Sequence, residues 1–312
     1  MRHRILQNGP LAPDLETQLA RQYDIHPLSK EADPKAFLAH RGGDFVGLVT
    51  SARHGADTAL LEAMPALKVI SSFGVGLDAF DLDTARRKGI PIGYTPDVLN
   101  DCVADTAFAL LMDVARNISA ADRFVRRGDW RTQQFPLATK VSGKRLGILG
   151  MGRIGRVIAR RASGFDMEVR YHNRRQASDV TYGYAPTLLE LATWADFLVI
   201  ASAGGDETRG LVSREILDAL GPKGYLINIS RGSVTDQDAL VDALVHKRIA
   251  GAGLDVFEHE PNVPEALMAL DHVVLLPHVA SNTHETRIAM AQRVQDNLAA
   301  FFAGQPMLSQ AL

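Results

Sequence analysis

Residues 145–155 read Arg-Leu-Gly-Ile-Leu-Gly-Met-Gly-Arg-Ile-Gly, and this stretch decides the fold. A short apolar run leads into Gly150-x-Gly152-x-x-Gly155, and a helical pattern follows it. In such a unit the first glycine permits a tight turn, the second lets the backbone approach a pyrophosphate, and the third lets the helix pack on its strand. The N–H groups and dipole of the new helix then hold negative charge. The sequence therefore predicts a dinucleotide-binding βαβ unit here.

The residues after the second strand of this unit indicate which nucleotide binds. An NAD site usually carries Asp or Glu about 20 residues past the motif, where it accepts hydrogen bonds from the ribose 2′-hydroxyl. This chain has Asn173, Arg174 and Arg175 there instead. One charge-assisted contact to a 2′-phosphate contributes about 1.5–3 kcal/mol, which is about tenfold or more in affinity. We therefore expect NADPH to be preferred over NADH, unless these arginines are merely solvated.

Composition excludes several classes of protein. The chain has 312 residues, 46% of them hydrophobic, and a net charge of −2, which is typical of a globular protein and not of a nucleic-acid or membrane-surface binder. Cys102 is the only cysteine, so a disulfide within the chain is impossible, and no metal site is expected. The sequence contains neither a signal peptide pattern nor an 18-residue apolar run, so a cytoplasmic enzyme is expected.

Two series of alternating strand and helix patterns predict two parallel sheets. The first series has strands at 4–7, 23–27, 45–50, 68–72 and 90–93, with helices at 11–21, 34–39, 58–63 and 81–88 between them. The second has strands at 145–149, 167–172, 197–201, 224–228, 251–254 and 273–275, with helices at 153–163, 187–193, 213–220 and 237–246 and a short one at 264–270. Alternation of this kind builds sheets covered on both faces.

Two helices complete the predicted organisation. A pattern of about 27 residues begins near Asn100 and carries an apolar stripe to Ile118, which is typical of a crossover between domains. The last helix, 285–302, lies beyond the final strand and is free to pack on the other domain. We therefore predict an α/β protein of two doubly wound domains with a cleft between them. A flavodoxin-like substrate domain comprises residues 1–97 and 285–312, and a Rossmann cofactor domain comprises residues 98–284.

Polar residues that follow the strands of the second sheet form the predicted site. Ligands of open α/β sheets bind outside the carboxyl ends of the strands. Arg231 follows the strand 224–228, Glu260 lies in the segment after 251–254, and His278 comes after 273–275. Glu258 and His259 compete with Glu260, because spacing alone does not exclude them.

These three residue types suit the reduction of a 2-keto acid. A histidine can give a proton to the developing alkoxide, and a carboxylate bonded to it fixes its tautomer. An arginine can bind the substrate carboxylate bidentately and polarise the carbonyl. The nicotinamide supplies the hydride, so no protein nucleophile is needed.

The order of the motifs closely resembles the D-2-hydroxyacid dehydrogenase family over nearly the whole chain. These motifs are Gly-x-Gly-x-x-Gly at 150–155, Ile-Ser-Arg-Gly at 229–232, Asp-Val-Phe-x-x-Glu-Pro at 255–261 and Pro-His-x-Ala-Ser at 277–281. The resemblance implies that Arg231 binds substrate, that His278 is the acid/base and that Glu260 is its partner. It also implies that the N–H groups of Val75 and Gly76 receive the substrate carboxylate, that 95–99 is an interdomain hinge, and that Leu99, Trp130 and Phe135 line the substrate pocket across a dimer interface. The last three are equally plausible as core or interface residues.

The resemblance also implies a set of cofactor contacts around the predicted βαβ unit and the strand ends. This set comprises Thr106, Gly150, Met151, Gly152, Arg153, Ile154, Asn173, Arg174, Arg175, Ala201, Ser202, Thr208, Ile229, Ser230, Arg231, Asp255, His278 and Ser281. Within it, Asp255 is expected to accept a hydrogen bond from the carboxamide. One segment departs from the family: residues 201–208 lack the proline that many members have, which makes the contacts there less certain.

The predicted function is NADPH-dependent reduction of a small 2-keto acid, glyoxylate or hydroxypyruvate, to the D-hydroxy acid where a stereocentre forms. The predicted assembly is a homodimer. A reductase for bulkier substrates of the phenylpyruvate or hydroxyphenylpyruvate type is the alternative within the enzyme class. A formate dehydrogenase is disfavoured, because that branch usually has glutamine where this chain has Glu260. A non-enzymatic NAD(P)-sensing protein like the corepressors of this fold is the alternative outside the enzyme class.

Overall fold

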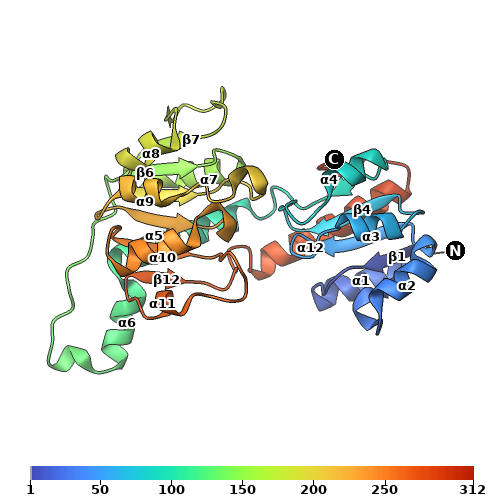
Figure 1. Ribbon diagram of the computed structural model, residues 1–312, viewed down its shortest axis with the longest axis horizontal. Helices are drawn as coiled ribbons and strands as arrows, with labels where there is room; N and C mark the ends of the chain where they lie inside the picture. The colour runs from blue at the N-terminus through green and yellow to red at the C-terminus, as the bar shows by residue number, and fades with distance from the viewer. Residues whose placement is uncertain (1) are drawn as a thin grey trace. The chain divides into compact units, whose positions relative to one another are not determined.

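The structure is a computed structural model that describes residues 2–312, and the chain divides into two compact units. The first unit comprises the residues up to Leu99 together with Thr283–Leu312, and the second comprises Asn100–Asn282. The predicted boundaries lay at 97/98 and 284/285, within two residues of these. The helices and strands of both units are labelled in Figure 1.

The first unit is built on a five-stranded parallel sheet in the order β2-β1-β3-β4-β5, which is the flavodoxin-like order. Its strands and helices are β1 (Arg4–Gln7), α1 (Pro13–Gln22), β2 (Asp24–Pro27), α2 (Pro34–Arg41), β3 (Gly47–Ser51), α3 (Thr58–Ala63), β4 (Val69–Phe73), α4 (Leu82–Arg87), β5 (Ile92–Gly93) and α12 (His284–Phe302). Two 3₁₀ turns, η1 (Leu28–Lys30) and η2 (Gly42–Asp44), flank α2.

The helix α12 covers one face of this sheet, although it lies more than 180 residues further along the chain. It packs on β4, β5 and α1, with Val294 and Leu298 fully buried. The Ser71 hydroxyl donates to the Val294 carbonyl at 3.1 Å, and the buried Asn297 amide donates to the Tyr94 carbonyl at 3.1 Å. The last helix therefore packs on the first unit, although the strands of the second unit precede it in the chain.

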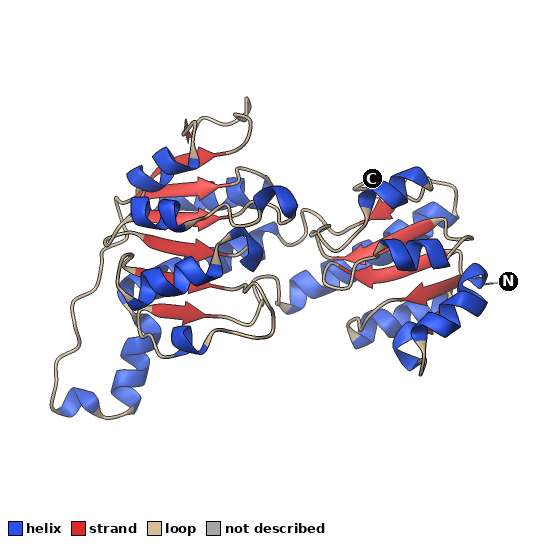
Figure 2. Cartoon of the chain, viewed as in Figure 1, coloured by secondary structure: helices blue, strands red, loops and turns tan. Residues whose placement is uncertain are grey.

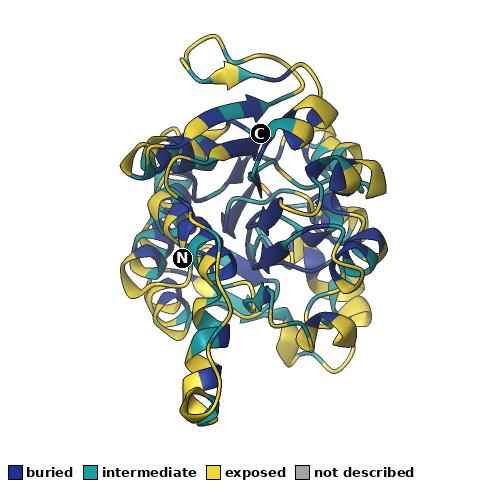
Figure 3. Ribbon diagram, turned by 90° about the vertical axis from the view of Figure 1, so that its left-hand side faces the viewer, coloured by how far each residue is buried: buried dark blue, intermediate teal, exposed yellow. Residues whose placement is uncertain are grey.

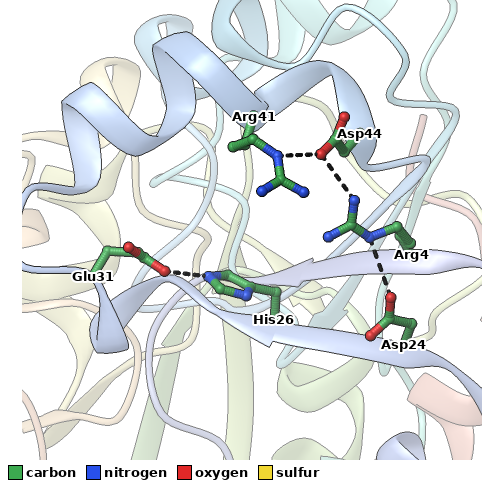
Figure 4. Close-up of polar contacts among 6 residues, drawn as sticks. All are labelled: Arg4, Asp24, His26, Glu31, Arg41 and Asp44. Carbon is green, nitrogen blue, oxygen red and sulfur yellow. Dashed lines mark hydrogen bonds and ion pairs between the residues drawn. The ribbon is translucent and has the colours of Figure 1, made fainter.

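A chain of ion pairs ties the edge of the first sheet to its neighbouring helices (Figure 4). Arg4 of β1 donates to Asp24 of β2 at 3.2 Å and to Asp44 of η2 at 2.8 Å. Arg41, the last residue of α2, also donates to Asp44, at 2.5 Å. Beside this chain, His26 of β2 pairs with Glu31 at 2.8 Å. These partly exposed contacts align the edge strand, and the apolar core behind them provides most of the stability.

The second unit is built on a seven-stranded parallel sheet in the order β12-β11-β10-β9-β6-β7-β8, with the Rossmann arrangement at its β8-β7-β6-β9-β10-β11 end. Its strands are β6 (Arg145–Leu149), β7 (Glu168–His172), β8 (Gly183–Tyr184), β9 (Phe197–Ile200), β10 (Tyr225–Asn228), β11 (Gly251–Leu254) and β12 (Val273–Leu275). Its helices are α5 (Asn100–Arg116), α6 (Ile118–Arg126), α7 (Arg153–Ala162), α8 (Leu188–Trp194), α9 (Arg214–Leu220), α10 (Gln237–Val245) and α11 (Glu265–Met268). Short 3₁₀ turns are η3 (Asp129–Arg131), η4 (Ser163–Phe165), η5 (Asp206–Thr208) and η6 (Gly232–Val234).

Helices cover both faces of the second sheet (Figures 1 and 2). The helices α5 and α7 pack together on one side, while α8, α9 and α10 form the layer on the other. The central strands are buried, and the outer faces of the helices are exposed (Figure 3). All four residues of β9 and all four of β10 are buried, as expected for parallel strands covered on both faces. The predicted fold of two parallel-sheet α/β domains is confirmed.

Two details of the second unit differ from the prediction. The prediction of one helix of about 27 residues is wrong. The helix α5 ends at Arg116, and α6 begins at Ile118. Asn117 between them adopts a left-handed conformation at φ 52°. Ile118, expected on the buried stripe, is 52% exposed. The sheet also has one strand more than the six predicted, because the two-residue β8 pairs with β7.

Among residues 2–312, no helix combines the length and the apolar character that crossing a membrane requires.

Candidate functional site

The fingerprint loop between β6 and α7 has the geometry that its glycines predict. Gly150 has φ +102°, and a Cβ there would lie 2.5 Å from the Ser202 backbone nitrogen. A Cβ on Gly155 would lie 2.1 Å from the Gly150 carbonyl oxygen, so α7 packs too closely for any side chain. A Cβ on Gly152 would meet no atom within 4 Å. Backbone at Gly152 is thus open to a ligand, while the other two positions are closed by protein.

Ser202 supports the reading of this loop as a ligand site. It follows β9, the strand beside β6, and its neighbour Ala201 donates a backbone hydrogen bond to Leu149 at 2.8 Å. The Ser202 hydroxyl oxygen is buried and has no hydrogen-bond partner among the described residues. A buried polar atom without a partner is costly, and a bound polar group is one way to satisfy it. Ser202 adjoins Gly150 of the fingerprint loop, so this orphaned hydroxyl fits a dinucleotide phosphate.

The loop after β7 is tied to the fingerprint loop through Asn173. Its side-chain oxygen accepts the Met151 backbone N–H at 2.7 Å, and its carbonyl accepts the Tyr184 hydroxyl at 3.1 Å. Further along the same loop, Asp179 accepts two hydrogen bonds, each 2.8 Å long, from the Arg156 guanidinium of α7. These contacts fix the backbone that carries Arg174 and Arg175.

The two arginines themselves reach the surface. Both Arg174 and Arg175 are exposed, and Arg174 pairs with Glu207 of η5, in the loop that follows β9. The position that an NAD site gives to a carboxylate therefore holds two exposed guanidiniums, one of them already bound to a carboxylate from another loop.

His278 and Glu260 form a hydrogen-bonded pair at the carboxyl edge of the same sheet. The Nδ1 atom of His278 lies 2.8 Å from Oε2 of Glu260, and the histidine side chain is 46% exposed. Burial raises the pKa of Glu260, but the hydrogen bond from His278, the charges of His278 and Arg231, and the Phe257 N–H outweigh it. The pKa of Glu260 therefore lies below its ordinary value, so this residue is a carboxylate at neutral pH.

The turn that carries His278 is held by a buried carboxylate. Asp255 is fully buried and accepts backbone hydrogen bonds from Val279 at 2.7 Å and Ala280 at 2.9 Å. Its carbonyl accepts the His278 N–H at 2.9 Å, and His278 adopts φ 55°. Burial raises the pKa of Asp255, against the opposing effects of these hydrogen bonds and of the His278 charge. Asp255 thus positions the histidine, and its remaining lone pairs are the ones available for the predicted carboxamide contact.

Arg231 is positioned by Asn228, the last residue of β10. The Asn228 amide donates to the Arg231 carbonyl at 2.9 Å, and its oxygen accepts the Ser230 N–H at 3.0 Å. The guanidinium of Arg231 donates to the Ser230 carbonyl at 2.7 Å and lowers the pKa of Glu260 by its charge. Arg231 and His278 therefore both lower the pKa of Glu260 through their charges.

Comparison with known proteins agrees with this geometry. Residues 108–280 match the D-isomer specific 2-hydroxyacid dehydrogenase family, NAD binding domain. A hydroxyphenylpyruvate reductase from Plectranthus scutellarioides is 46% identical over 305 residues, covering 98% of this chain and 97% of that protein.

The chain belongs to this dehydrogenase family.

Two further relatives add detail to the family assignment. A glyoxylate/hydroxypyruvate reductase A from Arabidopsis thaliana is 44% identical over 98% of this chain and 97% of its own. The crystal structure of an NADPH-dependent glyoxylate/hydroxypyruvate reductase from Sinorhizobium meliloti, in complex with NADP and malonate, has a TM-score of 0.93 and 41% identity, covering 100% of this chain and 97% of that one. This dehydrogenase is accordingly an oxidoreductase with an NAD(P)-binding Rossmann domain.

The two competing acid/base candidates are separated by the structure. Glu258 lies 3.9 Å from the Arg209 guanidinium, and its backbone N–H donates to Gln237, while His259 is exposed. The structure pairs Glu260, and neither Glu258 nor His259, with His278.

The predicted anion-binding loop of the dehydrogenase lies in the first unit, directly after β4. Gly74 donates its N–H to the Thr95 hydroxyl at 3.1 Å and accepts the Thr95 N–H at 2.9 Å, which anchors the loop to the predicted hinge segment. Among residues 2–312, no backbone carbonyl accepts a hydrogen bond from the N–H groups of Val75 or Gly76. Their role as donors to a substrate carboxylate stays a prediction.

The other predicted contact residues have varied surroundings. Thr106 of α5 donates to the Ala280 carbonyl at 3.3 Å, beside Ser281, whereas the Thr208 hydroxyl donates within its own loop to Ala203 at 2.9 Å. Leu99 is buried, with 3% of its surface exposed, and Trp130 is 70% exposed. Phe135 packs edge-on against Phe124 with ring centroids 5.3 Å apart. Arg153 begins α7, Ile154 is partly buried, and Ile229 and Ser230 are buried. Cofactor and substrate contacts of these residues stay predictions.

Sequence reasoning missed three residues that shape the site. Asn228 holds the Arg231 turn, and Glu207 pairs with Arg174. A Cβ on Gly204 would lie 2.6 Å from Cγ of Arg231, so the loop after β9 packs on that side chain. Only Asn228 had a signal in the sequence, as a polar residue at the end of an apolar strand.

Proposed function

We propose that this dehydrogenase reduces a small 2-keto acid, glyoxylate or hydroxypyruvate, to the 2-hydroxy acid, with NADPH as the preferred coenzyme. The observation that carries the proposal is the pairing of His278 with the ionised Glu260 beside Arg231, at the sheet edge that also bears the glycine fingerprint. Glyoxylate/hydroxypyruvate reductases among the similar proteins support this substrate class.

Each of the three residues has a proposed part in the reaction. Arg231 binds the substrate carboxylate and polarises the keto group, and the Val75 and Gly76 N–H groups donate to the same carboxylate. His278 gives its proton to the developing alkoxide, while Glu260 stabilises the imidazolium and holds its tautomer. The bound reduced nicotinamide supplies the hydride.

The proposed coenzyme preference rests on Arg174 and Arg175. Gly150, Met151 and Gly152 with the start of α7 would hold the pyrophosphate, and the two arginines the 2′-phosphate. Arg174→Asp tests this part of the proposal. The substitution is expected to lower kcat/KM for NADPH by about tenfold or more while kcat/KM for NADH is maintained or improved. An unaltered NADPH/NADH ratio would show that the phosphate is bound elsewhere.

The substrate proposal is tested by steady-state rates on a panel of keto acids with NADPH and NADH. Turnover above about 1 s⁻¹ on glyoxylate or hydroxypyruvate supports it. Tight NADPH binding without turnover of any keto acid would contradict it and favour a sensing role.

A second candidate substrate is hydroxyphenylpyruvate. The reductase from Plectranthus scutellarioides, which is 46% identical, carries that name. The ratio of kcat/KM for hydroxyphenylpyruvate to that for hydroxypyruvate decides between them, and a ratio well above one favours the bulkier substrate.

We also propose that the dehydrogenase works as a homodimer. Large apolar side chains on and after α6 are exposed, namely Ile118 at 52%, Val125 at 54%, Trp130 at 70% and Leu137 at 100%. Exposed apolar groups gathered on one segment are typical of an interface. Light scattering at micromolar concentration tests this, since a mass near 34 kDa would exclude a dimer and one near twice that value would support it. A cytoplasmic location stays a prediction.

A further inference from the structure

The contact between Arg174 and Glu207 joins two loops that are far apart in the chain. Arg174 follows β7 and Glu207 lies in η5 after β9, and β6 runs between these two strands in the sheet. The fingerprint glycines leave the same edge from β6. An ion pair between the flanking loops therefore spans the place where we propose that the coenzyme binds.

This ion pair contributes little to stability. The side chains of Arg174 and Glu207 are 80% and 75% exposed, and the Arg174 loop is already fixed by Asn173 and by the Arg156–Asp179 pair. The η5 loop is fixed independently, because the Thr208 hydroxyl and backbone N–H bond within it. Surface ion pairs of this kind typically stabilise a fold by about 1 kcal/mol or less.

The pair has a clearer consequence for anion binding. A guanidinium binds carboxylates and phosphates through the same N–H groups, and the Glu207 carboxylate accepts a hydrogen bond from Nη1 of Arg174. A 2′-phosphate on Arg174 therefore competes with Glu207 for this nitrogen and lies near a second negative charge. NADH has no phosphate there and does not compete for Arg174.

We propose that Glu207 sets the strictness of coenzyme selection by competing with the 2′-phosphate for Arg174. This inference rests on the proposed function, because it assumes that Arg174 receives that phosphate. Glu207 thereby weakens NADPH binding and leaves NADH binding nearly unchanged. The ratio of the NADPH affinity to the NADH affinity becomes smaller as a result.

The test is coenzyme-fragment binding measured by calorimetry on the full chain, with 2′,5′-ADP and 5′-AMP as probes at fixed ionic strength. Glu207→Gln keeps the side-chain shape and removes the charge. It is expected to tighten 2′,5′-ADP binding by about three- to tenfold and to change 5′-AMP binding by less than about twofold. The neighbouring Asp206→Asn is the matched control, because Asp206 lies 4.0 Å from Arg209 and makes no ion pair with Arg174. It is expected to change 2′,5′-ADP binding by less than about twofold.

Combination with Arg174→Ala isolates the pair. In the Arg174→Ala background, Glu207→Gln is expected to tighten 2′,5′-ADP binding by less than in the wild-type background, since the contested guanidinium is gone and only the repulsion between Glu207 and the phosphate remains. The inference is overturned if Glu207→Gln leaves 2′,5′-ADP binding unchanged in the wild-type background, or if Asp206→Asn tightens it equally.

Failure of the proposed function gives a different pattern. If the wild-type chain binds 2′,5′-ADP no more tightly than 5′-AMP, and Arg174→Ala changes neither, then the proposed coenzyme preference is itself wrong. If Arg174→Ala weakens 2′,5′-ADP binding while Glu207→Gln does not change it, the proposed preference for NADPH stands. Only the competition by Glu207 is then refuted.

Discussion

Replacing Glu260 by glutamine is expected to slow keto acid reduction in a pH-dependent way. Glutamine keeps the size of the side chain and an oxygen that can accept the His278 N–H, which lies 2.8 Å from the carboxylate. The substitution removes only the negative charge. Because the lowered pKa of Glu260 keeps it ionised at neutral pH, the wild-type carboxylate places a negative charge 2.8 Å from the residue that we propose as the proton donor.

The size of the effect follows from the geometry of the pair. Two unit charges about 4 Å apart attract by about 1 kcal/mol in water and about 4 kcal/mol at an effective dielectric constant of 20. The side chains of His278 and Glu260 are 46% and 24% exposed, so solvent screening favours the lower part of this range, about 1–2 kcal/mol. Since about 1.4 kcal/mol corresponds to a factor of ten, Glu260→Gln should slow reduction by about tenfold.

The assay is kcat/KM for keto acid reduction between pH 5 and pH 9. Towards pH 9, Glu260→Gln is expected to be about tenfold slower, and towards pH 5 the two profiles should converge. Glu258→Gln is the matched control, because Glu258 faces Arg209 at 3.9 Å and has no hydrogen bond to His278. Its profile should coincide with that of the wild type.

A uniform loss at every pH would refute this reasoning, since it would mean that Glu260 acts by shape and position alone. An unchanged profile would equally refute it, because the carboxylate would then have no influence on the proton donor.

Three further substitutions probe other parts of the site. His278→Ala should lower turnover by about 10²- to 10⁴-fold with NADPH affinity maintained, and an unchanged kcat would remove it from the acid role. Arg231→Ala should lower kcat/KM for the keto acid by at least about tenfold but hardly change the dissociation constant of NADPH, and equal losses would contradict its assignment. Gly155→Ala should cost about 1–3 kcal/mol in chemical denaturation and weaken NADPH binding, because its Cβ would lie 2.1 Å from the Gly150 carbonyl; wild-type stability would disprove that clash.

Sequence periodicity predicted the fold well where elements have caps and long apolar patterns. It failed at Asn117, because no glycine or proline marks the break between α5 and α6. Asparagine tolerates the left-handed conformation, and Asp113 of α5 accepts hydrogen bonds from the backbone and hydroxyl of Ser119. A cap supplied by the preceding helix leaves no pattern in the sequence. The strand β8 was missed because two residues are too few to show alternation.

The candidate site was predictable where motifs fix residues to strand ends. Arg231, Glu260 and His278 each follow a strand of one parallel sheet, so topology alone brings them to one edge. The choice of Glu260 over Glu258 needed coordinates, because side-chain direction within an irregular loop has no periodicity. The pairing of Arg174 with Glu207 was hidden for a related reason: it joins two loops that are 33 residues apart.

The placement of α12 has a consequence for synthesis on the ribosome. The second unit is continuous, so all of its strands are synthesised before Thr283–Leu312 of the first unit. The first unit begins the chain, yet the face of β4 and β5 stays bare until Val294 and Leu298 arrive. The apolar face of the first sheet therefore stays exposed to solvent while nearly two hundred further residues are synthesised. Chaperone contact during translation should be concentrated on the sheet of the first unit.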